Sequence, residues 1–306
     1  MENNPTFSII LTTYNRAHLL QRAIDSVLSQ SYGNFELLII NDGSTDTTNE
    51  VVNSIHDPRI RYRIQERNYG LQRSRNLGLD IAIGQYLYFL DDDDELTPGA
   101  LELIIQLVER ISLKDFKIFW FDSIDAEKNT LSGVGLGNVE KKVEYLDLLC
   151  GKIRGDYTQV LNREAFGTTR FDERLWGYEG LLLLKLHKQY DGYFFPIVVK
   201  KAYRHHGVRM CNTSILPHLP QYILGETFYI KEFGDKLKTV CPDKYAEHLS
   251  NLGYFQMLNG QKGDARDNIF LSLKYRFSMK FLIFYVVSYF LSKQQVIYLC
   301  RTFQKI

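Results

Sequence analysis

In the first third of the chain, continuous apolar runs alternate with segments in which apolar residues recur at helical spacing. Nearly continuous apolar runs predict strands buried on both faces at 7–11, 35–40 and 86–90, with a shorter strand at 59–64. Between these strands, apolar residues recur at helical spacing over 19–28, 51–55 and 71–83. Asn15 is a candidate N-cap of the first helix. The alternation predicts a parallel α/β sheet with right-handed crossovers.

The pattern is more mixed after Pro98, where another helix begins, and it becomes entirely helical after Pro220. Strands are predicted near 117–121, 156–161 and 193–203, and helices near 144–150 and 181–187. Further helices are predicted near 221–234, 243–259, 263–275, 279–291 and 294–303. We therefore place a domain boundary near residue 215. An α/β domain is expected over 1–215 and a smaller, all-helical region over 216–306.

A run of five carboxylates, Asp91 to Glu95, follows directly on the apolar strand Tyr86 to Leu90. Open α/β sheets bind ligands at the carboxyl ends of their strands. Adjacent carboxylates repel one another unless a cation neutralises them, and their oxygens suit Mg²⁺ or Mn²⁺. A solvated acidic turn is the alternative. Asp94 and Glu95 are expected to cap the next turn.

Composition narrows the function classes further. The formal net charge of +1 argues against nucleic acid as the main partner. The four cysteines have no CxxC spacing, so neither a zinc site nor a disulfide framework is expected. The first residues do not form a signal peptide, which together with the cysteines indicates a cytoplasmic protein. No GxGxxG follows the first strand and no GxxxxGK[ST] is present, so dinucleotide and P-loop sites are unsupported.

Several short motifs occur in one order along residues 5–215. They are Ile10-Leu-Thr-Thr-Tyr-Asn-Arg16, Asn41-Asp-Gly-Ser44, Arg73-Ser-Arg-Asn-Leu-Gly78, Phe89-Leu-Asp-Asp-Asp-Asp-Glu-Leu96 and Tyr203-Arg-His-His206. As an ordered set they resemble the family 2 glycosyltransferases of the bacterial cell-surface polysaccharide type. The resemblance implies a GT-A fold, a nucleotide-binding sheet with a parallel core. It also implies inverting transfer of a sugar from a nucleotide diphosphate donor.

Donor-binding residues are predicted at the strand ends. Thr12 and Tyr14 end the first strand, where a base could stack on the Tyr14 ring. Asp42 ends the second strand and can accept a hydrogen bond from uracil N3–H or a ribose hydroxyl, so UDP is the favoured nucleotide. The alternatives are a half-buried, packed Tyr14 and an Asx turn at Asp42. Arg75 matches the family's Arg-Asn pair and would offset negative charge, unless it forms only a surface ion pair.

The resemblance also assigns the metal ligands and the catalytic base. The metal motif falls on Asp91, Asp92 and Asp93, with Asp93 the direct ligand of Mg²⁺ or Mn²⁺. The pattern Tyr-Arg-x-His selects His206 as a second ligand. Glu179 stands where the family keeps a catalytic Asp, so Glu179 is the candidate general base. The longer Glu side chain departs from the family pattern, and a charged residue in a first helical turn is the alternative.

The C-terminal region combines basic and aromatic residues with an apolar run. Basic residues flank Phe277 ahead of the apolar run 281–291, which predicts an in-plane membrane contact through 274–305. The alternative is that this run is the buried core of the helical region. Members of the family often act on lipid-linked acceptors at the inner face of a bacterial membrane. The resemblance therefore implies a glycan or lipid-linked acceptor and a cytoplasmic protein that associates with that face.

Two other functions fit parts of the sequence. A sugar nucleotidyltransferase also places acidic metal ligands on an α/β sheet, but it needs a Gly-rich basic loop after the first strand, and residues 12–16 do not form one. A non-catalytic sugar-nucleotide-binding protein would explain the departure from the family pattern at Glu179.

Overall fold

The computed structural model describes residues 4–111, 115–175, 177–203, 216–287, 289–290 and 294–295. These residues fall into two compact units. The first comprises the described residues up to 148 together with 152–173 and 180–203. The second comprises the described residues from 216 onward, together with 149–151, 174–175 and 177–179. The boundary predicted near 215 falls outside the described residues, but short segments from earlier in the chain belong to the helical unit.

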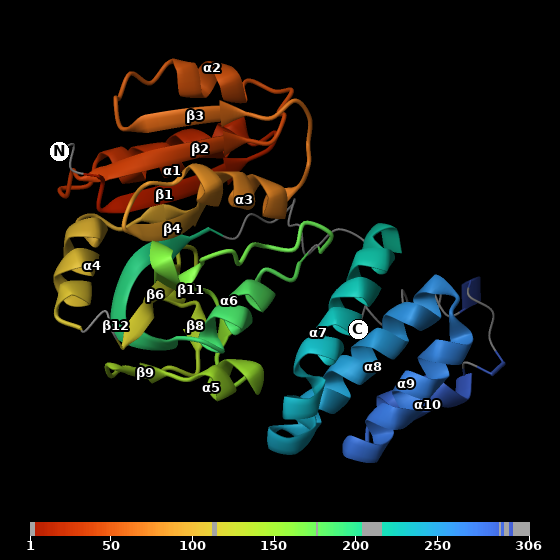
Figure 1. Ribbon diagram of the computed structural model, residues 1–306. Coiled ribbons are helices and arrows are strands. Elements are labelled where there is room, and N and C mark those ends of the chain that lie inside the picture. Colours follow the sequence, from red (N-terminus) through yellow and green to blue (C-terminus); the bar gives the residue numbers. More distant parts are fainter. Residues whose placement is uncertain are drawn as a thin grey trace. The chain divides into compact units, whose positions relative to one another are not determined.

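A mixed sheet of ten strands, counted over the described residues, forms the centre of the first unit (Figure 1). Its main path runs in the order β3-β2-β1-β4-β11-β6-β12-β5, with β7 beside β6 and β9 beside β12. The strands are β1 Phe7–Thr13, β2 Phe35–Asn41, β3 Ile60–Ile64, β4 Tyr86–Asp91, β5 Glu95–Leu96, β6 Phe116–Asp125, β7 Thr130–Leu131, β9 Lys141–Val143, β11 Tyr157–Asn162 and β12 Asp191–Ala202. A separate two-stranded sheet pairs β8 Gly133–Val134 with β10 Arg154–Gly155.

The strands β3, β2, β1 and β4 run parallel, as the alternating pattern predicts. All seven residues of β1 and all seven of β2 are buried, because helices cover both faces of this part of the sheet. Antiparallel β11 then joins β4 to β6, and β12 runs parallel to β6. The predicted α/β class with a parallel core is confirmed.

Helices alternate with the strands in the first unit. They are α1 Ala17–Leu28, α2 Thr48–Asn53, α3 Leu71–Ile81, α4 Ala100–Glu109, α5 Tyr145–Leu149, the 3₁₀ turn η1 Arg163–Ala165 and α6 Gly180–His187. Neighbouring residues of β1 enter opposite cores because successive strand side chains alternate between faces. Leu11 packs with Leu20 and Ile24 of α1, whereas Ile10 packs with Leu79 of α3. The sheet is therefore the wall between two hydrophobic cores.

The start of α1 differs from the prediction. Asn15 does not cap α1; its backbone has a φ of 52°, and its side-chain oxygen accepts the backbone N–H of Thr45. The Asp46 carboxylate instead accepts the backbone N–H of Ala17 at 3.0 Å. It thus satisfies one of the N–H groups that have no partner within the first turn of a helix. The reason is that the turn after β2 lies against the turn after β1. A distant carboxylate therefore replaces the local cap.

The second unit is helical and includes the 3₁₀ turn η3 Leu216–His218. Its helices are α7 Leu219–Val240, α8 Pro242–Asn259, α9 Lys262–Tyr275 and α10 Met279–Val287. The predicted helices near 221–234, 243–259 and 263–275 are confirmed, and the one near 279–291 is confirmed over Met279–Val287. The helix predicted near 294–303 lies almost wholly outside the described residues. None of the helices in the described ranges is long and apolar enough to cross a bilayer.

The expectation of no disulfide is wrong. Cys150 and Cys241 form a disulfide that closes a sequence separation of 91 residues. Both cysteines belong to the second unit, so this bond fixes the segment 149–151 to the junction of α7 and α8. Spacing carries no signal for such a distant pair, because the two residues meet only after the helices have packed.

We expect Gly78→Ala to destabilise the protein by about 1–3 kcal/mol, the usual cost of overpacking a core. A Cβ at Gly78 would lie 2.4 Å from Cγ2 of Ile10, because α3 approaches β1 closely at this point. Urea denaturation monitored by circular dichroism would measure the change. Gly33→Ala is the matched control, since nothing lies within 4 Å of its added Cβ. Equal stability of the two variants would contradict this account of the close approach.

Candidate donor and metal site

The carboxyl ends of β1, β2 and β4 lie together at one edge of the sheet. Thr12 of β1 lies opposite Asp91 of β4, and Thr13 of β1 lies opposite Asn41 of β2. The turns that leave these strands contain the motifs predicted to bind the donor. The structure thus brings Thr12, Tyr14, Asp42 and the acidic run to one place, the edge at which parallel sheets bind ligands.

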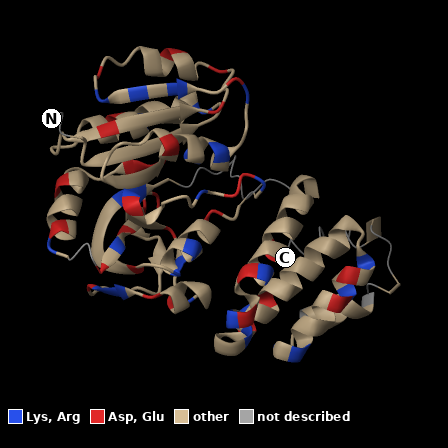
Figure 2. Ribbon diagram, in the orientation of Figure 1, with Lys and Arg blue, Asp and Glu red and all other residues tan. Residues whose placement is uncertain are grey.

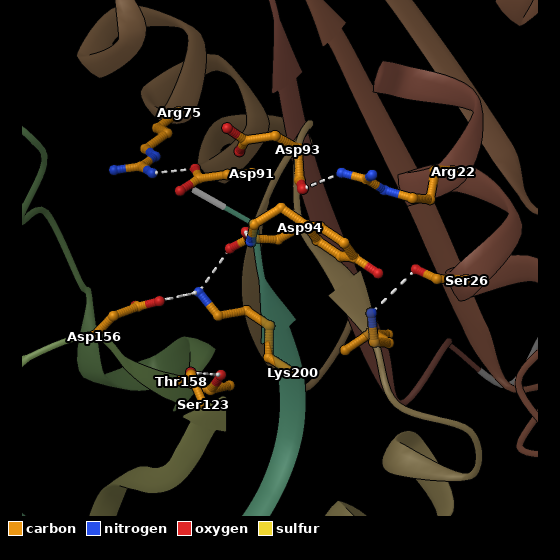
Figure 3. A network of polar contacts seen from close by, with 12 residues as sticks. Arg22, Ser26, Arg75, Asp91, Asp93, Asp94, Ser123, Asp156, Thr158 and Lys200 are labelled. Atoms are coloured by element: carbon orange, nitrogen blue, oxygen red, sulfur yellow. Dashed lines mark hydrogen bonds and ion pairs between the residues drawn. The ribbon is translucent and has the colours of Figure 1, made fainter. Parts of the chain in front are cut away.

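Basic side chains of the same unit pair with every carboxylate of the acidic run. Arg75 lies 2.8 Å from Asp91, Arg16 pairs with both Asp92 and Asp93, Arg22 lies 3.0 Å from Glu95, and Lys200 lies 2.8 Å from Asp94. Figure 3 shows Arg75, Arg22 and Lys200 approaching the run from different elements. The chain itself therefore supplies much of the positive charge that the acidic run needs.

Lys200 of β12 lies beneath the acidic run with its side chain 9% exposed. Its ammonium group contacts Asp94 at 2.8 Å and Asp156 at 3.0 Å (Figure 3). Burial alone would lower the pKa of Lys200, but attraction to these two carboxylates outweighs it and raises the pKa of Lys200. Asp94 also accepts the backbone N–H of Tyr203. Asp94 is thus an internal partner of Lys200.

The prediction that Asp94 and Glu95 cap the next turn is wrong for both residues. Asp94 is buried at 5% exposure against Lys200, and Glu95 lies in β5, opposite Lys201 of β12. Both side chains are used to join the acidic run to distant strands and helices. The three carboxylates left for a ligand are those of Asp91, Asp92 and Asp93, the set that the family resemblance selects.

These three carboxylates differ in environment. The Asp92 side chain is buried, accepts the Thr13 hydroxyl at 2.7 Å and pairs with Arg16. Burial raises the pKa of Asp92 to about 7, although the charge of Arg16 opposes the rise. The Asp93 side chain is 22% exposed and that of Asp91 is 50% exposed. Asp91 and Asp93 are therefore the members of the run that an incoming cation or phosphate can reach most easily.

Asp42 has a structural function that the sequence did not reveal. Its carboxylate is buried at 4% exposure and accepts hydrogen bonds from Gln65 and from the backbone N–H groups of Tyr69 and Gly70. These bonds fix the turn that leads into α3, which carries Arg75. A carboxylate offers about four acceptor positions, so one position remains for a ligand. The Asx-type bond at this turn belongs to Asn41, which accepts the N–H of Ser44.

The other predicted donor-binding residues keep their places at the edge. Tyr14 follows β1 directly and is 41% exposed, so part of its ring is accessible to a ligand. Thr12 is buried at 8% exposure within β1. Arg75 lies 5.7 Å from the ring centres of both Phe89 and Phe171, which hold its guanidinium beside Asp91.

Oxygen ligands at this edge fit a divalent cation. No group of three metal-ligating side chains lies together among the residues that the structure describes. Mg²⁺ is commonly bound by only one or two carboxylates together with substrate phosphates, and the partly exposed Asp93 offers such an oxygen. The second predicted ligand, His206, lies outside the described residues.

Glu179 lies immediately before α6 and belongs to the second unit with Tyr178. Glu173, an alternative base close in sequence, belongs to the first unit, where it accepts a hydrogen bond from Asn76 at 3.1 Å. Asn76 also bonds the backbone of Phe171 in both directions, so the stretch before α6 is anchored to α3. The role of Glu179 as a base stays a prediction.

Sequence reasoning missed three basic residues of this site: Arg16, Arg22 and Lys200. Arg16 follows Tyr14 within the first motif and was therefore within reach of motif analysis. Arg22 lies one turn into α1, where only its i+6 spacing from Arg16 is visible. Lys200 is 106 residues from Asp94, and no local pattern connects the two.

Comparison with known proteins places these motifs in one family. The family model described as Glycosyl transferase family 2 matches residues 8–131. A GalNAc(5)-diNAcBac-PP-undecaprenol beta-1,3-glucosyltransferase of Campylobacter jejuni is 32% identical over 204 residues, which is 65% of this chain and 64% of that protein. An uncharacterized glycosyltransferase of Haemophilus influenzae is 35% identical over 174 residues, 55% of this chain and 67% of that protein.

Solved structures share the fold. The S. aureus TarS fragment 1–349 in complex with UDP-GlcNAc superposes with a TM-score of 0.66 at 17% identity, covering 88% of this chain and 81% of that one. The mannosyltransferase PcManGT from Pyrobaculum calidifontis, in complex with GDP-Man and Mn²⁺, gives a TM-score of 0.57 at 14% identity over 94% and 80% of the chains. The expected GT-A fold is confirmed by these neighbours. The family match, the relatives and the ordered motifs agree, and the chain belongs to glycosyl transferase family 2.

Proposed function

We propose that this protein is a metal-dependent, inverting glycosyltransferase. It moves a sugar from a nucleotide diphosphate donor, with UDP favoured, to a glycan or lipid-linked oligosaccharide acceptor in cell-surface polysaccharide synthesis. The observation that carries this proposal is the sheet edge where Tyr14, Asp42 and Asp91 to Asp93 meet in a chain of this family. The UDP-GlcNAc bound by TarS and the undecaprenol-linked acceptor in the name of the Campylobacter relative support the donor and acceptor classes.

The donor's parts match the chemistry of the edge in order. The exposed Tyr14 ring offers a stacking surface for the base, and the remaining acceptor position of Asp42 suits uracil N3–H or a ribose hydroxyl. Arg16 and Arg75 lie on the acidic run, where they can also contact phosphate oxygens. The diphosphate would therefore lie beside Asp91 and Asp93.

Asp93 would hold the divalent cation, with Asp91 close by. When bound, the cation supplies positive charge that stabilises the leaving nucleotide diphosphate. Arg16 pairs with the same Asp93 carboxylate, so a cation there would share or replace this ion pair. The Arg16 guanidinium released from Asp93 would then be able to pair with the donor phosphates. The complex of PcManGT with GDP-Man and Mn²⁺ supports the use of a divalent metal.

We expect Asp93→Asn to weaken metal-dependent binding of a UDP-sugar by at least roughly 10- to 100-fold, because loss of even an outer-shell partner of a metal ligand has an effect on this scale. The substitution keeps the shape of the side chain and removes its charge. Calorimetric titration with UDP-GlcNAc, in Mn²⁺ and in EDTA, measures the effect, and UDP and GDP are compared in the same buffer.

Asp80→Asn serves as the control, because Asp80 is 57% exposed in an ion pair with Arg170 on the surface. An unchanged affinity of Asp93→Asn in Mn²⁺ would refute the metal assignment. Tighter binding of GDP than of UDP by the wild-type protein would refute the preference for UDP.

Glu179 is the proposed general base for the acceptor hydroxyl. A sugar hydroxyl is a weak nucleophile, and partial removal of its proton allows attack on the anomeric carbon as the nucleotide leaves. The feature that supports this choice is that Glu179 directly precedes α6, where the family keeps its base.

We expect Glu179→Gln to lower kcat by roughly 10²–10⁴, the usual contribution of a general base. Donor affinity should hardly change, because Glu179 is assigned no contact with the nucleotide. Radiolabelled sugar transfer measures turnover, and Glu164→Gln is the control because Glu164 is 78% exposed and pairs with Lys117. Glu179→Asp restores the residue type of the family with a shorter side chain. If Glu179→Gln turns over at the wild-type rate, Glu179 is not the base, and Asp172 and Glu173 become the candidates.

The acceptor's lipid would bring the protein to the inner face of the cell membrane, and α9 and α10 offer a suitable surface. Phe281, Phe284 and Tyr285 of α10 pack into the core of the second unit, so part of the buried-core alternative holds. Met279, Ile283 and Phe290 instead remain exposed at 59%, 55% and 81%. Figure 2 shows basic residues interspersed with acidic ones on α9. Two basic residues of α9, Arg266 and Lys274, lie over the rings of Tyr289 and Phe270.

We expect Ile283→Asp to reduce binding to phosphatidylglycerol-containing vesicles by roughly tenfold or more, since burying an aliphatic side chain yields about 1.5–3 kcal/mol. Co-sedimentation with these vesicles and with phosphatidylcholine vesicles measures partition. Ile64→Asp is the matched control, because Ile64 is 57% exposed on β3 of the other unit. Equal partition of the two variants would show that α10 does not contact lipid.

A further inference from the structure

A buried polar cluster lies in the helical unit, away from the acidic run. Glu226 of α7 is 4% exposed and His248 of α8 is 8% exposed. The Glu226 carboxylate lies 2.6 Å from Nδ1 of His248 and accepts a longer bond of 3.3 Å from Asn251. The Tyr229 ring stacks on His248 with 3.8 Å between ring centres. The donor and metal chemistry proposed above uses none of these groups.

Stability alone does not explain such a cluster. Removing a carboxylate from water costs several kcal/mol, and apolar residues of similar volume often serve a core equally well. Buried polar groups can instead fix one arrangement of the elements around them. The question is therefore which segment this cluster holds.

Tyr178, from an earlier part of the chain, packs on α7 at Gly225, the residue next to Glu226 of the cluster. Its hydroxyl donates to the backbone carbonyl of Tyr222 at 3.3 Å, and the two rings meet edge to face at 6.2 Å. Burial and the nearby charge of Glu226 raise the pKa of Tyr178, so the phenol stays protonated and remains a donor. The ring lies over Gly225, where an added Cβ would be 2.3 Å from a ring carbon. The helix α7 is thus shaped to receive this ring.

The contact of Tyr178 with α7 affects the proposed base because the two residues are adjacent in the chain. Tyr178 directly precedes Glu179, and both belong to the helical unit although residues 152–173 and 180–203 on either side belong to the first unit. Fixing Tyr178 limits where the backbone of Glu179 can lie. A displacement of about 1 Å in a reacting group can cost on the order of 10²-fold in rate.

We propose that Tyr178 is a positioning residue for the base Glu179, held in place by Gly225 and Tyr222 of α7. This proposal rests on the assignment of Glu179 as the base.

The sharpest test is Gly225→Ala. Alanine has a higher helix propensity than glycine, so α7 itself should not be weakened, but the new methyl group must push the Tyr178 ring aside. We expect kcat to fall by roughly 10-fold or more, whereas donor affinity in Mn²⁺ stays within twofold of wild type. Gly263→Ala in α9 is the matched control, because nothing lies within 4 Å of its added Cβ.

A double substitution separates positioning from general damage. Tyr178→Leu removes the ring that the Gly225→Ala methyl group would strike. If the two residues act through their contact, the double variant should turn over no more slowly than Tyr178→Leu alone. Tyr178→Phe keeps the ring and removes only the hydroxyl bond, so it reports on the bond to Tyr222 if Gly225→Ala does not fold. Tyr178→Phe should lower kcat several-fold with donor affinity unchanged.

The outcomes can be told apart from those of the base assignment. If Glu179→Gln is inactive but Gly225→Ala and Tyr178→Phe both turn over at the wild-type rate, Tyr178 has no positioning role and the proposed base stands. If Glu179→Gln is fully active, the base assignment and this inference both fail. A fall in donor affinity equal to the fall in kcat would also overturn the proposal, since it would show a general loss of structure.

Discussion

The charge balance at the end of β4 is the constraint on which the rest of the site depends. Carboxylates from Asp91 to Glu95 follow a buried strand, and they can lie together because basic side chains arrive from elsewhere. Arg16 comes from the turn before α1, Arg75 from α3 and Lys200 from β12. Each pair ties one element to the acidic run. The same contacts that hold this edge of the fold together therefore place alternating positive and negative groups where a metal ion and a diphosphate would bind.

Lys200 shows how the second half of the α/β unit supports the first. β12 lies beside β6, which is joined through β11 to β4, and this order returns the chain to the acidic run. Lys200 then meets Asp94 and also Asp156, which directly precedes β11. Asp42 has a similar function on the other side, because its bonds to Tyr69 and Gly70 fix the turn that leads to α3. Lys200 and Asp42 therefore both stabilise the backbone around the site through contacts with residues distant in sequence.

Local patterns were enough to predict the strands, the parallel core and the edge at which the motifs meet. Continuous apolar runs mark β1, β2 and β4 because burial on both faces leaves no alternation. Contacts made only in the folded chain could not be predicted. Asn15 was expected to cap α1, yet Asp46 takes that role, and Cys150 pairs with Cys241 across 91 residues. In each case the partner is set by how elements pack, which a short window of sequence does not contain.

The proposed base, Glu179, belongs to the helical unit and not to the α/β unit that contains the acidic run. Residues 152–173 and 180–203 belong to the α/β unit, whereas Tyr178 and Glu179 belong to the unit that contains α7 to α10. As the proposed base, Glu179 would be adjusted by substitutions in α7 or α8 that leave the acidic run and its arginines unchanged. Donor binding and proton removal would then depend on separate hydrophobic cores.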